Sequence, residues 1–388
     1  MKKILFLQNK GKSLGGIWFV NKTLGEQFLK LGYDIEIAAI RNNKVDINFE
    51  YNPKINVFTI NENDLWEIPH KRDVLNSIRK LKFFRTVYKY VLEQRKIKKD
   101  YNTLSNYIKK SSPNYIIVSH YQLLETIPSE YLKSTIFVQH SSFDDVLKYK
   151  NCIKTVKKYN NLLGKICWLT KKTCENAKEY GITNSTYIYN PIRIFSNKVA
   201  DVDRNKTLVT ISRIDADQKR IDLMIKIADK IFKDKKFSNW SLKIYGPGNL
   251  SDDLIKIVDR NPQIELMGKI DDISKALLSS SIYLSTSYME GFSMSILEAY
   301  EFGIPVVAYN FGESCREQIL DNETGNIIDL YDENKFIEKL TYLMNNPEIL
   351  KRYSKNSKEY ANNFNVQNIA NQWIKLFKQV DGNKNVWY

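Results

Sequence analysis

The amino-acid sequence predicts an α/β protein of two domains, each built on a parallel sheet, and three observations support this prediction. The chain has 388 residues, enough for two domains with separate cores. Short apolar runs alternate with amphipathic helical runs in both halves, which is typical of βαβ units. The alternation stops at Asn190-Pro191, because proline cannot extend a central strand, and begins again after the polar stretch 195–206. We therefore expect one domain over residues 1–190 and a second over residues 191–364.

The composition is that of a folded globular chain, with 43% hydrophobic and 27% charged residues. No run approaches the roughly 18 apolar residues of a membrane span. The run Ile4–Leu7 is also too short for the apolar region of a signal peptide, which takes about 7–15 residues. The four cysteines have no CxxC spacing and the three histidines no HxxxH spacing, so a structural metal site is not expected. These features predict a cytoplasmic protein with reduced thiols.

The charge balance predicts an anionic partner. The chain has 59 Lys and Arg against 44 Asp and Glu, a net charge of +15. Nucleic acid, an anionic membrane surface and phosphorylated small molecules all fit such a charge. The chain has no basic zipper, no paired zinc-finger spacing and no aromatic RNA-binding string, so we do not expect nucleic acid as a partner.

Residues 71–99 are the most basic stretch, with eleven Lys and Arg against the two acids Asp73 and Glu93. Apolar residues recur among them at helical spacing. A basic amphipathic helix of this kind can lie on anionic lipid, with lysines at the headgroups. The alternative is a docked surface helix whose basic face is solvated.

The N-terminal half begins with a βαβ unit. A strand at Lys3–Gln8 and a loop at Asn9–Gly16 precede a helix that starts at Ile17 and stops at Gly32. The glycines of the loop form neither a P-loop nor a dinucleotide fingerprint. Further strands are predicted at 34–40, Pro113–His120, Ser134–His140, Lys165–Thr170 and Ser185–Ile192, with a helix at Lys171–Gly181.

Two of these strands end in a histidine, His120 and His140. Because ligands bind at the carboxyl ends of parallel strands, either imidazole can face a binding cleft. The alternative is a structural histidine with its hydrogen bonds satisfied.

The C-terminal half repeats the alternation. A strand at Thr207–Arg213 precedes a helix at Arg220–Asp234. Later strands are predicted at 241–249, 264–270, 282–287 and 306–309, a turn at Gly325, and helices at 273–281 and 366–380.

Two cations and two carboxylates follow the first of these strands. Arg213 and Lys219, near a helix start, can clamp a diphosphate without a metal, although each alone is typical of a surface loop. Asp215 and Asp217 form a DxD pair, which in one-domain nucleotide-sugar enzymes can hold Mn²⁺. Because the pattern of this sequence predicts two sheets and not one, we interpret these aspartates as loop or N-cap residues.

The stretch Tyr288–Val307 is the centre of the predicted site. It joins the strand at 282–287 to a helix ended by Gly303 and then to the strand at 306–309. The helix start offers unpaired N–H groups and a positive dipole end for an anion. Glu290 at the turn is placed for binding, whereas Ser295-x-x-Glu298 also fits a capping box within the helix.

These motifs resemble the Glu-x7-Glu signature of family 4 (group 1) of the retaining GT-B glycosyltransferases. Glu290-Gly291-Phe292, Glu298-Ala299 and Gly303-x-Pro305 carry the resemblance, which covers nearly the whole chain and is strongest over Arg213–Val307. It implies two Rossmann-like domains facing a central cleft. The segment 365–388 is then a helix that returns to the N-terminal domain, with Trp373 and Phe377 as anchors.

The resemblance also implies roles for individual residues. Glu290 would bind hydroxyls of the donor sugar and Glu298 the ribose, while backbone N–H groups from Gly291 to Ser295 would hold the diphosphate together with Arg213 and Lys219. Arg213 and Lys219 are six apart where many members have five, which leaves Arg220 as an alternative to Lys219. The implied catalytic residues are Glu290, Arg213, Lys219 and His140. The implied substrate-binding residues are Gly15, Gly16, Gly268, Lys269, Ile270, Gly291, Phe292, Ser293, Met294, Ser295 and Glu298.

The function predicted from the sequence is sugar transfer, with retained anomeric configuration, from a nucleotide diphosphate sugar such as a UDP-sugar. The acceptor would be a hydroxyl of a glycan, a lipid-linked molecule or a cell-envelope polymer, and no metal cofactor is expected. Residues 71–99 would bring the enzyme to the inner face of the cell membrane as a peripheral protein. The alternatives are a nucleotide-sugar epimerase and a non-catalytic nucleotide-sugar-binding subunit.

Overall fold

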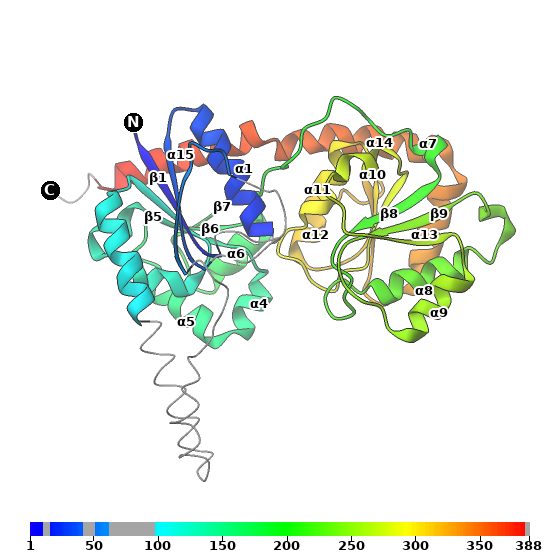
Figure 1. The fold of residues 1–388 in the computed structure, drawn as a ribbon, viewed down its shortest axis with the longest axis horizontal. Coiled ribbons are helices and arrows are strands. Elements are labelled where there is room, and N and C mark those ends of the chain that lie inside the picture. Colours follow the sequence, from blue (N-terminus) through cyan, green and yellow to red (C-terminus); the bar gives the residue numbers. More distant parts are fainter. Residues whose placement is uncertain (11–15, 42–50, 62–97, 385–388) are drawn as a thin grey trace, which may run out of the picture.

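The computed structural model describes residues 1–10, 16–41, 51–61 and 98–384, and these form two α/β lobes side by side (Figure 1). Gly15 and residues 71–97 of the basic stretch lie outside the described residues, so those predictions stay as they were made. Each lobe holds one parallel sheet with the strand order of a doubly wound fold. The fold is therefore the GT-B fold that the resemblance implied.

The N-terminal lobe has a seven-stranded sheet in the order β3-β2-β1-β4-β5-β6-β7. Its central strand β1 pairs in parallel with β2 on one side and β4 on the other. Alternate residues of β1 enter the two cores, Ile4 and Phe6 one, Leu5 and Leu7 the other, so both faces of the sheet are covered. The strands are β1 Lys3–Lys10, β2 Asp34–Arg41, β3 Asn56–Asn61, β4 Tyr115–Val118, β5 Thr135–Gln139, β6 Lys165–Trp168 and β7 Ser185–Tyr187. The helices are α1 Gly16–Lys30, residues 98–111, η1 Tyr121–Thr126, η2 Ser129–Ser134, α4 Phe143–Lys148, α5 Lys150–Tyr159 and α6 Lys171–Glu179.

The C-terminal lobe has a six-stranded sheet in the order β10-β9-β8-β11-β12-β13. The order reverses between β8 and β11, which opens a crevice at the carboxyl ends of these strands. The strands are β8 Thr207–Ile211, β9 Ser241–Tyr245, β10 Ile264–Gly268, β11 Ile282–Ser285, β12 Val306–Tyr309 and β13 Gly325–Ile328. The helices are α7 Val202–Asn205, α8 Ile221–Ile231, η3 Lys235–Phe237, α9 Asp252–Arg260, α10 Ile273–Leu278, α11 Met294–Glu301, α12 Glu313–Gln318, α13 Glu333–Asn345, α14 Pro347–Ala361 and η4 Asn362–Phe364.

The last helix, α15 (Val366–Lys384), runs from the C-terminal lobe back to the N-terminal lobe and packs on α1 (Figure 1). Phe377 is 1% exposed and stacks on Tyr115 with ring centroids 4.3 Å apart. Trp373 packs beside it, 5.9 Å between centroids. At the end of the helix Asp381 pairs with Lys2 at 2.6 Å, so both ends of the described chain meet at the same lobe.

Some details differ from the sequence prediction. Gly325 is not a turn residue but the first residue of β13. Glycine is needed there because a Cβ would overlap the carbonyl oxygen of Val306 in the neighbouring strand. The strand β3 and the helices α4, α5, α9, α12, α13 and α14 were not predicted from the sequence. Within the described ranges, no helix is long and apolar enough to cross a membrane.

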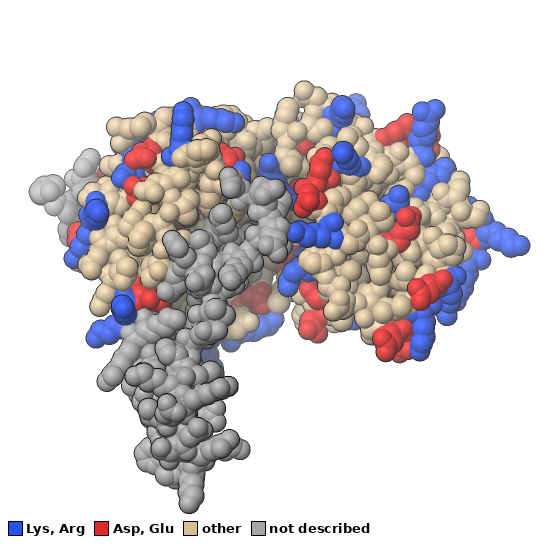
Figure 2. Space-filling model, in the orientation of Figure 1, with Lys and Arg blue, Asp and Glu red and all other residues tan. Residues whose placement is uncertain are grey.

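Charge is spread over the surface rather than gathered in one patch on the face in Figure 2. There Lys and Arg side chains occur on both lobes with Asp and Glu among them. On this face the excess of positive charge does not form the continuous stripe that tracks a nucleic-acid backbone.

Candidate active site

A cavity of about 270 Å³ lies between the two lobes, at the carboxyl ends of strands from both sheets. The N-terminal lobe contributes the start of α1 and the segment after β5, and the C-terminal lobe contributes the loop before α11. Six residues predicted from the sequence line it: Gly16, His140, Glu290, Gly291, Phe292 and Met294. The other residues that line it are Ile17, Ser141, Asp145, Leu169, Asn190, Gln218 and Met289.

Gly291 marks a close approach of the two lobes in this cavity. A Cβ at this position would overlap the carbonyl oxygen of His140 and lie 3.1 Å from the Cα of Ser141. The φ of Gly291 is not in the left-handed region, so glycine is needed here for space and not for backbone conformation. The glycine next to Glu290 therefore brings that glutamate up to the backbone of the N-terminal lobe.

Glu290 is paired with Lys219, whose ammonium group contacts Glu290 Oε1. The hydroxyl of Ser287 donates to the same oxygen at 2.9 Å. Both charged side chains are largely buried, 17% exposed for Lys219 and 11% for Glu290. The ammonium of Lys219 is engaged by Glu290 in this structure, and its predicted contact with a diphosphate stays a prediction.

Asp215 shapes the loop that carries Lys219. Its Oδ1 accepts hydrogen bonds from the backbone N–H groups of Gln218 (2.8 Å) and Lys219 (2.7 Å). This agrees with the interpretation of Asp215 as a loop residue. Asp217 is exposed. Arg220, the alternative to Lys219, instead pairs with Asp222 at 3.3 Å, so Lys219 is the cation that faces Glu290.

Arg213 does not line the cavity itself, and its side chain is 65% exposed. Its Nη2 donates to Gln218 Oε1 at 3.1 Å, and Gln218 Nε2 donates in turn to the carbonyl of Met289 at 3.2 Å. Gln218 therefore connects the arginine to the loop that bears Glu290. The structure brings Arg213, Lys219 and Glu290 to one edge of the C-terminal sheet.

Glu298 does not line the cavity. The helix α11 starts at Met294 with Ser293 as its N-cap, so the capping-box interpretation of Ser295 and Glu298 is wrong. Glu298 is 3% exposed and pairs with Arg193, which comes from the segment that joins the lobes. Burial raises the pKa of Glu298, and the arginine acts in the opposite direction. Arg193 contacts only Oε1 of Glu298, and the predicted contact of this glutamate with the ribose stays a prediction.

The start of α11 offers fewer free N–H groups than predicted. The N–H of Ser293 donates to Gln318 Oε1 at 2.8 Å, and Gln318 Nε2 donates back to the carbonyl of Ser293 at 2.8 Å. The N–H of Ser293 therefore already has an acceptor in this structure, and its predicted contact with a diphosphate stays a prediction. Met294 and Ser295 remain, because first-turn N–H groups have no partner within a helix.

Phe292 has a packing role. It is 7% exposed, and its ring lies 5.7 Å from that of Tyr189 and 5.9 Å from that of Phe364. These rings come from the segment that joins the lobes and from the turn before α15, so Phe292 holds the junction of the lobes more than it presents a surface to a ligand.

His140 follows β5 and borders the cavity. Burial lowers the pKa of His140 to about 3, and the nearby His120 adds to this effect. The imidazole is therefore neutral near pH 7 and can accept or donate one hydrogen bond without carrying charge.

Gly268 ends the edge strand β10, Lys269 and Ile270 follow it, and none of the three lines the cavity. Gly268 has φ +67°, a left-handed conformation that favours glycine, and its carbonyl accepts the N–H of Gly246 at 2.8 Å. Gly268 and Lys269 are exposed at the outer end of the crevice. Their predicted contact with the substrate stays a prediction.

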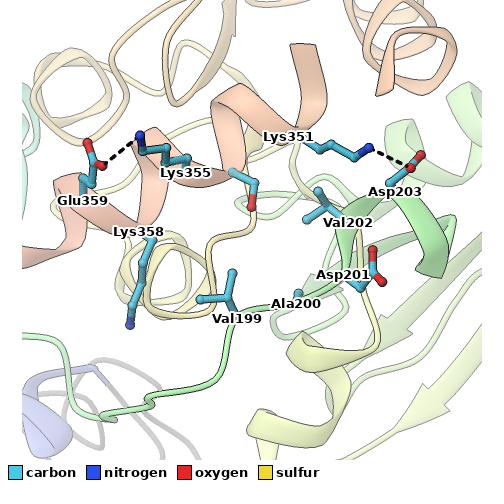
Figure 3. Close-up of a pocket in the computed structure, with 10 residues that line it drawn as sticks. Val199, Ala200, Asp201, Val202, Asp203, Lys351, Lys355, Lys358 and Glu359 are labelled. Atoms are coloured by element: carbon cyan, nitrogen blue, oxygen red, sulfur yellow. Dashed lines mark ion pairs between the residues drawn. The ribbon is translucent and has the colours of Figure 1, made fainter. Parts of the chain in front are cut away.

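A second cavity, of about 380 Å³, lies between α14 and the residues that precede β8 (Figure 3). Its cations already have partners: Lys351 pairs with Asp203 at 3.2 Å, and Lys358 donates to the carbonyl of Ser196 at 2.9 Å. Lys355 pairs with Glu359 at 3.9 Å. The contacts of Lys351 and Lys358 attach the segment before β8 to α14, whereas the pair of Lys355 and Glu359 lies within α14.

Comparison with known proteins gives a consistent result. Residues 192–360 match the family model described as glycosyl transferases group 1. An uncharacterized glycosyltransferase of Haemophilus influenzae is 26% identical over 96% of this chain and 99% of its own length. Poly(ribitol-phosphate) alpha-N-acetylglucosaminyltransferase of Staphylococcus aureus is 27% identical over 61% of this chain and 48% of its own length.

Solved structures share the fold of the whole chain. A Staphylococcus aureus TarM variant, in complex with Fondaparinux, alpha-GlcNAc-glycerol and UDP, is similar with a TM-score of 0.73 at 16% identity over 97% of this chain and all of that one. Sucrose-phosphate synthase of Thermosynechococcus elongatus is similar with a TM-score of 0.72 at 16% identity over 99% of this chain and all of that one. At such identities the likeness is one of fold.

Proposed function

The chain is a glycosyltransferase of the group 1 family with the GT-B fold, and on this premise we propose that it moves a sugar from a UDP-sugar to an acceptor hydroxyl. The observation that carries the proposal is the group of Arg213, Lys219 and Glu290 at one end of the interlobe cavity. When the bond to the sugar breaks, negative charge grows on the diphosphate. Cations and helix N–H groups placed there stabilise that charge more than they stabilise the bound donor.

Within this proposal Glu290 binds the donor sugar. Lys219 and Ser287 both contact Oε1, so we assign a sugar hydroxyl to Oε2. A carboxylate already neutralised by an ammonium and a hydroxyl is a weak nucleophile, which supports retention without a covalent sugar–enzyme intermediate at Glu290. The neutral imidazole of His140, on the opposite lobe, is placed to accept or donate a hydrogen bond near the acceptor hydroxyl.

The acceptor in this proposal is an anionic cell-envelope polymer or a lipid-linked glycan. Similar proteins are named for poly(ribitol-phosphate) in Staphylococcus aureus, poly(glycerol-phosphate) in Bacillus subtilis and an undecaprenol-linked glycan in Campylobacter jejuni. In this chain residues 146–174 contain eight lysines and no acid. Lys148 in this stretch reaches the cavity, with Nζ 3.8 Å from the sulfur of Met289.

The lysines of α5 form one face of that helix. Lys150, Lys154, Lys157 and Lys158 follow the spacing i, i+4, i+7 and i+8, and all four are exposed. Cys152, Val156 and Tyr159 are buried on the other side. A cationic face that begins next to the cavity supports an anionic acceptor. Like the basic stretch 71–99, for which we predicted contact with a membrane, it offers lysines to an anionic partner.

The donor is tested by calorimetric titration with UDP, using GDP and ADP as controls, with and without EDTA. We expect UDP to bind in EDTA and to bind about tenfold more weakly to Arg213→Ala, a loss of about 1.4 kcal/mol. Arg213 is 65% exposed, so this variant is expected to fold. Lys355→Ala, which removes a 77% exposed lysine of α14, serves as the matched control and should bind UDP as the wild type does.

Three results would contradict this proposal. UDP binding only with Mn²⁺ would assign the site to Asp215 and Asp217. Absence of binding to any of the three nucleotides would remove the donor from the proposal. Conversion of a UDP-sugar into an isomer without acceptor would indicate the epimerase alternative.

A further inference from the structure

The short helix α12 (Glu313–Gln318) touches both lobes with two different faces. Glu313 and Glu317 are one turn apart and point to the N-terminal lobe. Ser314 and Gln318 are also one turn apart and point to the loop 290–293, which carries Glu290. Residues four apart lie on the same side of a helix, so each pair acts as a unit.

On the first face, Glu317 completes the start of helix α6 in the other lobe. Its Oε2 accepts the N–H of Lys171 at 2.8 Å, and its Oε1 accepts the N–H of Lys172 at 2.7 Å. The next N–H, that of Thr173, is taken by the side chain of Thr170 at 3.1 Å. First-turn N–H groups have no partner within their helix. Two of these three therefore depend on a carboxylate from the C-terminal lobe.

Further contacts extend this face. Glu313 accepts the hydroxyl of Thr173 at 2.7 Å and the side-chain amide of Asn176. Glu317 also accepts the hydroxyl of Tyr189 at 2.9 Å. All of these donors are backbone or neutral groups, although the chain has 59 Lys and Arg. The contact therefore depends on where α6 lies and not on mobile cationic side chains.

On the second face, α12 holds the loop that bears Glu290, the residue proposed to bind the donor sugar. The hydroxyl of Ser314 donates to the carbonyl of Glu290 at 3.1 Å. Gln318, 0% exposed, exchanges two hydrogen bonds with Ser293, each of 2.8 Å. These bonds set the backbone at both ends of the segment Glu290–Ser293.

We propose that α12 couples the arrangement of the two lobes to the geometry of the loop 290–293, here called the donor loop. Glu317 and Gln318 are the positioning residues of this coupling. A helix of six residues moves as one body, so a shift of α6 that pulls on Glu317 displaces Gln318 and with it Ser293. The coupling is reciprocal, because a ligand that orders the donor loop must then favour the contact with α6 by the same factor. Its meaning for catalysis rests on the function proposed above, whereas the mechanical link does not.

The link is tested first without any nucleotide. Gln318→Met keeps a side chain of similar length and removes both bonds to Ser293, and Ser314→Ala removes one hydroxyl. Hydrogen exchange is followed by mass spectrometry in the peptide 169–175, which contains the N–H groups that Glu317 holds. We expect exchange about tenfold faster in Gln318→Met and faster, to a lesser degree, in Ser314→Ala. Arg316→Ala, an exposed residue of the same helix, should exchange as the wild type does.

Unchanged exchange in both Gln318→Met and Ser314→Ala would overturn the proposal. A general loss of structure would accelerate exchange in every peptide, so a peptide from β1 serves as the internal reference. Ser314→Ala keeps the test decisive if Gln318→Met does not fold.

The converse test uses Glu317→Gln, which keeps the shape of the side chain. Both carboxylate oxygens accept hydrogen bonds, so the amide group turns a donor toward an N–H whichever way it is oriented. We expect UDP affinity to fall about fivefold although Glu317 does not reach the cavity, and kcat to fall more than KM changes. Wild-type affinity and kcat together with faster exchange in α6 would overturn the coupling. If the wild type does not bind UDP, the proposed donor fails, and the exchange experiment still decides the role of α12.

Discussion

The pair of Lys219 and Glu290 allows a test that separates folding from chemistry. Lys219→Met removes the ammonium and keeps the length of the side chain. Glu290, 11% exposed, then retains only the hydroxyl of Ser287 at 2.9 Å as a partner on Oε1. Breaking a fully buried pair costs about 3–5 kcal/mol, because it leaves an uncompensated charge. The adjoining cavity of about 270 Å³ gives water access to this carboxylate, so we expect roughly 2–3 kcal/mol.

Stability and activity should then respond differently to a second substitution. For a domain of the size of the C-terminal lobe, this loss of stability corresponds to a fall in Tm of about 4–12 °C. We expect kcat with a UDP-sugar to fall at least about 100-fold, as when one stabilising group of a developing anion is removed. In Lys219→Met/Glu290→Gln no charge is left unpaired, so Tm should return toward the wild-type value. The kcat of the double variant should stay low, because neither group is restored.

The assays are thermal unfolding followed by circular dichroism and a transferase assay at saturating donor. Lys226→Met, which changes an exposed lysine of the helix α8 that follows Lys219, is the matched control and should change neither quantity. Recovery of kcat together with Tm in the double variant would refute the reasoning, since the pair would then be structural only. A Lys219→Met enzyme with wild-type kcat would do the same.

Three further predictions concern the contact between lobes, the returning helix and pH. Gly291→Ala places a methyl group against the carbonyl of His140, and we expect the free energy of UDP binding to weaken by about 1–3 kcal/mol. Gly382→Ala, where a Cβ meets nothing within 4 Å, is the control and should bind UDP as the wild type does. Equal affinity in the two variants would contradict the close approach at Gly291. Phe377→Ala should lower the free energy of unfolding by about 3–5 kcal/mol, because it removes the ring that stacks on Tyr115. Denaturant titration measures this loss, with Lys378→Ala on the exposed side of α15 as the control. A loss below about 1 kcal/mol would mean that α15 is only loosely attached. Burial lowers the pKa of His140 from 6.5 to about 3, so between these pH values the unfolded chain binds more protons and this residue destabilises the fold as pH falls. His140→Asn should therefore lose less stability than the wild type between pH 7 and pH 4.5, as measured by urea unfolding. An identical loss would show that the imidazole is not buried as a neutral group.

Local patterns in the sequence were enough for the architecture. Alternating apolar runs predicted two parallel sheets, and the break at Asn190-Pro191 lies in the segment that joins the two lobes of the structure. The placement of Arg213, Lys219 and Glu290 after strands β8 and β11 also followed from the sequence, since neighbouring parallel strands end at the same edge of a sheet. Such patterns have periods of two to four residues, so they are visible in a single stretch of chain.

Only the tertiary structure decided which partner each polar group takes. Glu298 was expected to face a ligand or its own helix start, and it pairs with Arg193, 105 positions away. Ser293 was expected to offer its N–H to a phosphate, and Gln318, 25 positions away, accepts it. Nothing in the local sequence of α12 distinguishes a solvated acidic helix from one that holds two lobes together. A buried polar group must be satisfied by whatever lies beside it, and that neighbour is set by how distant segments pack.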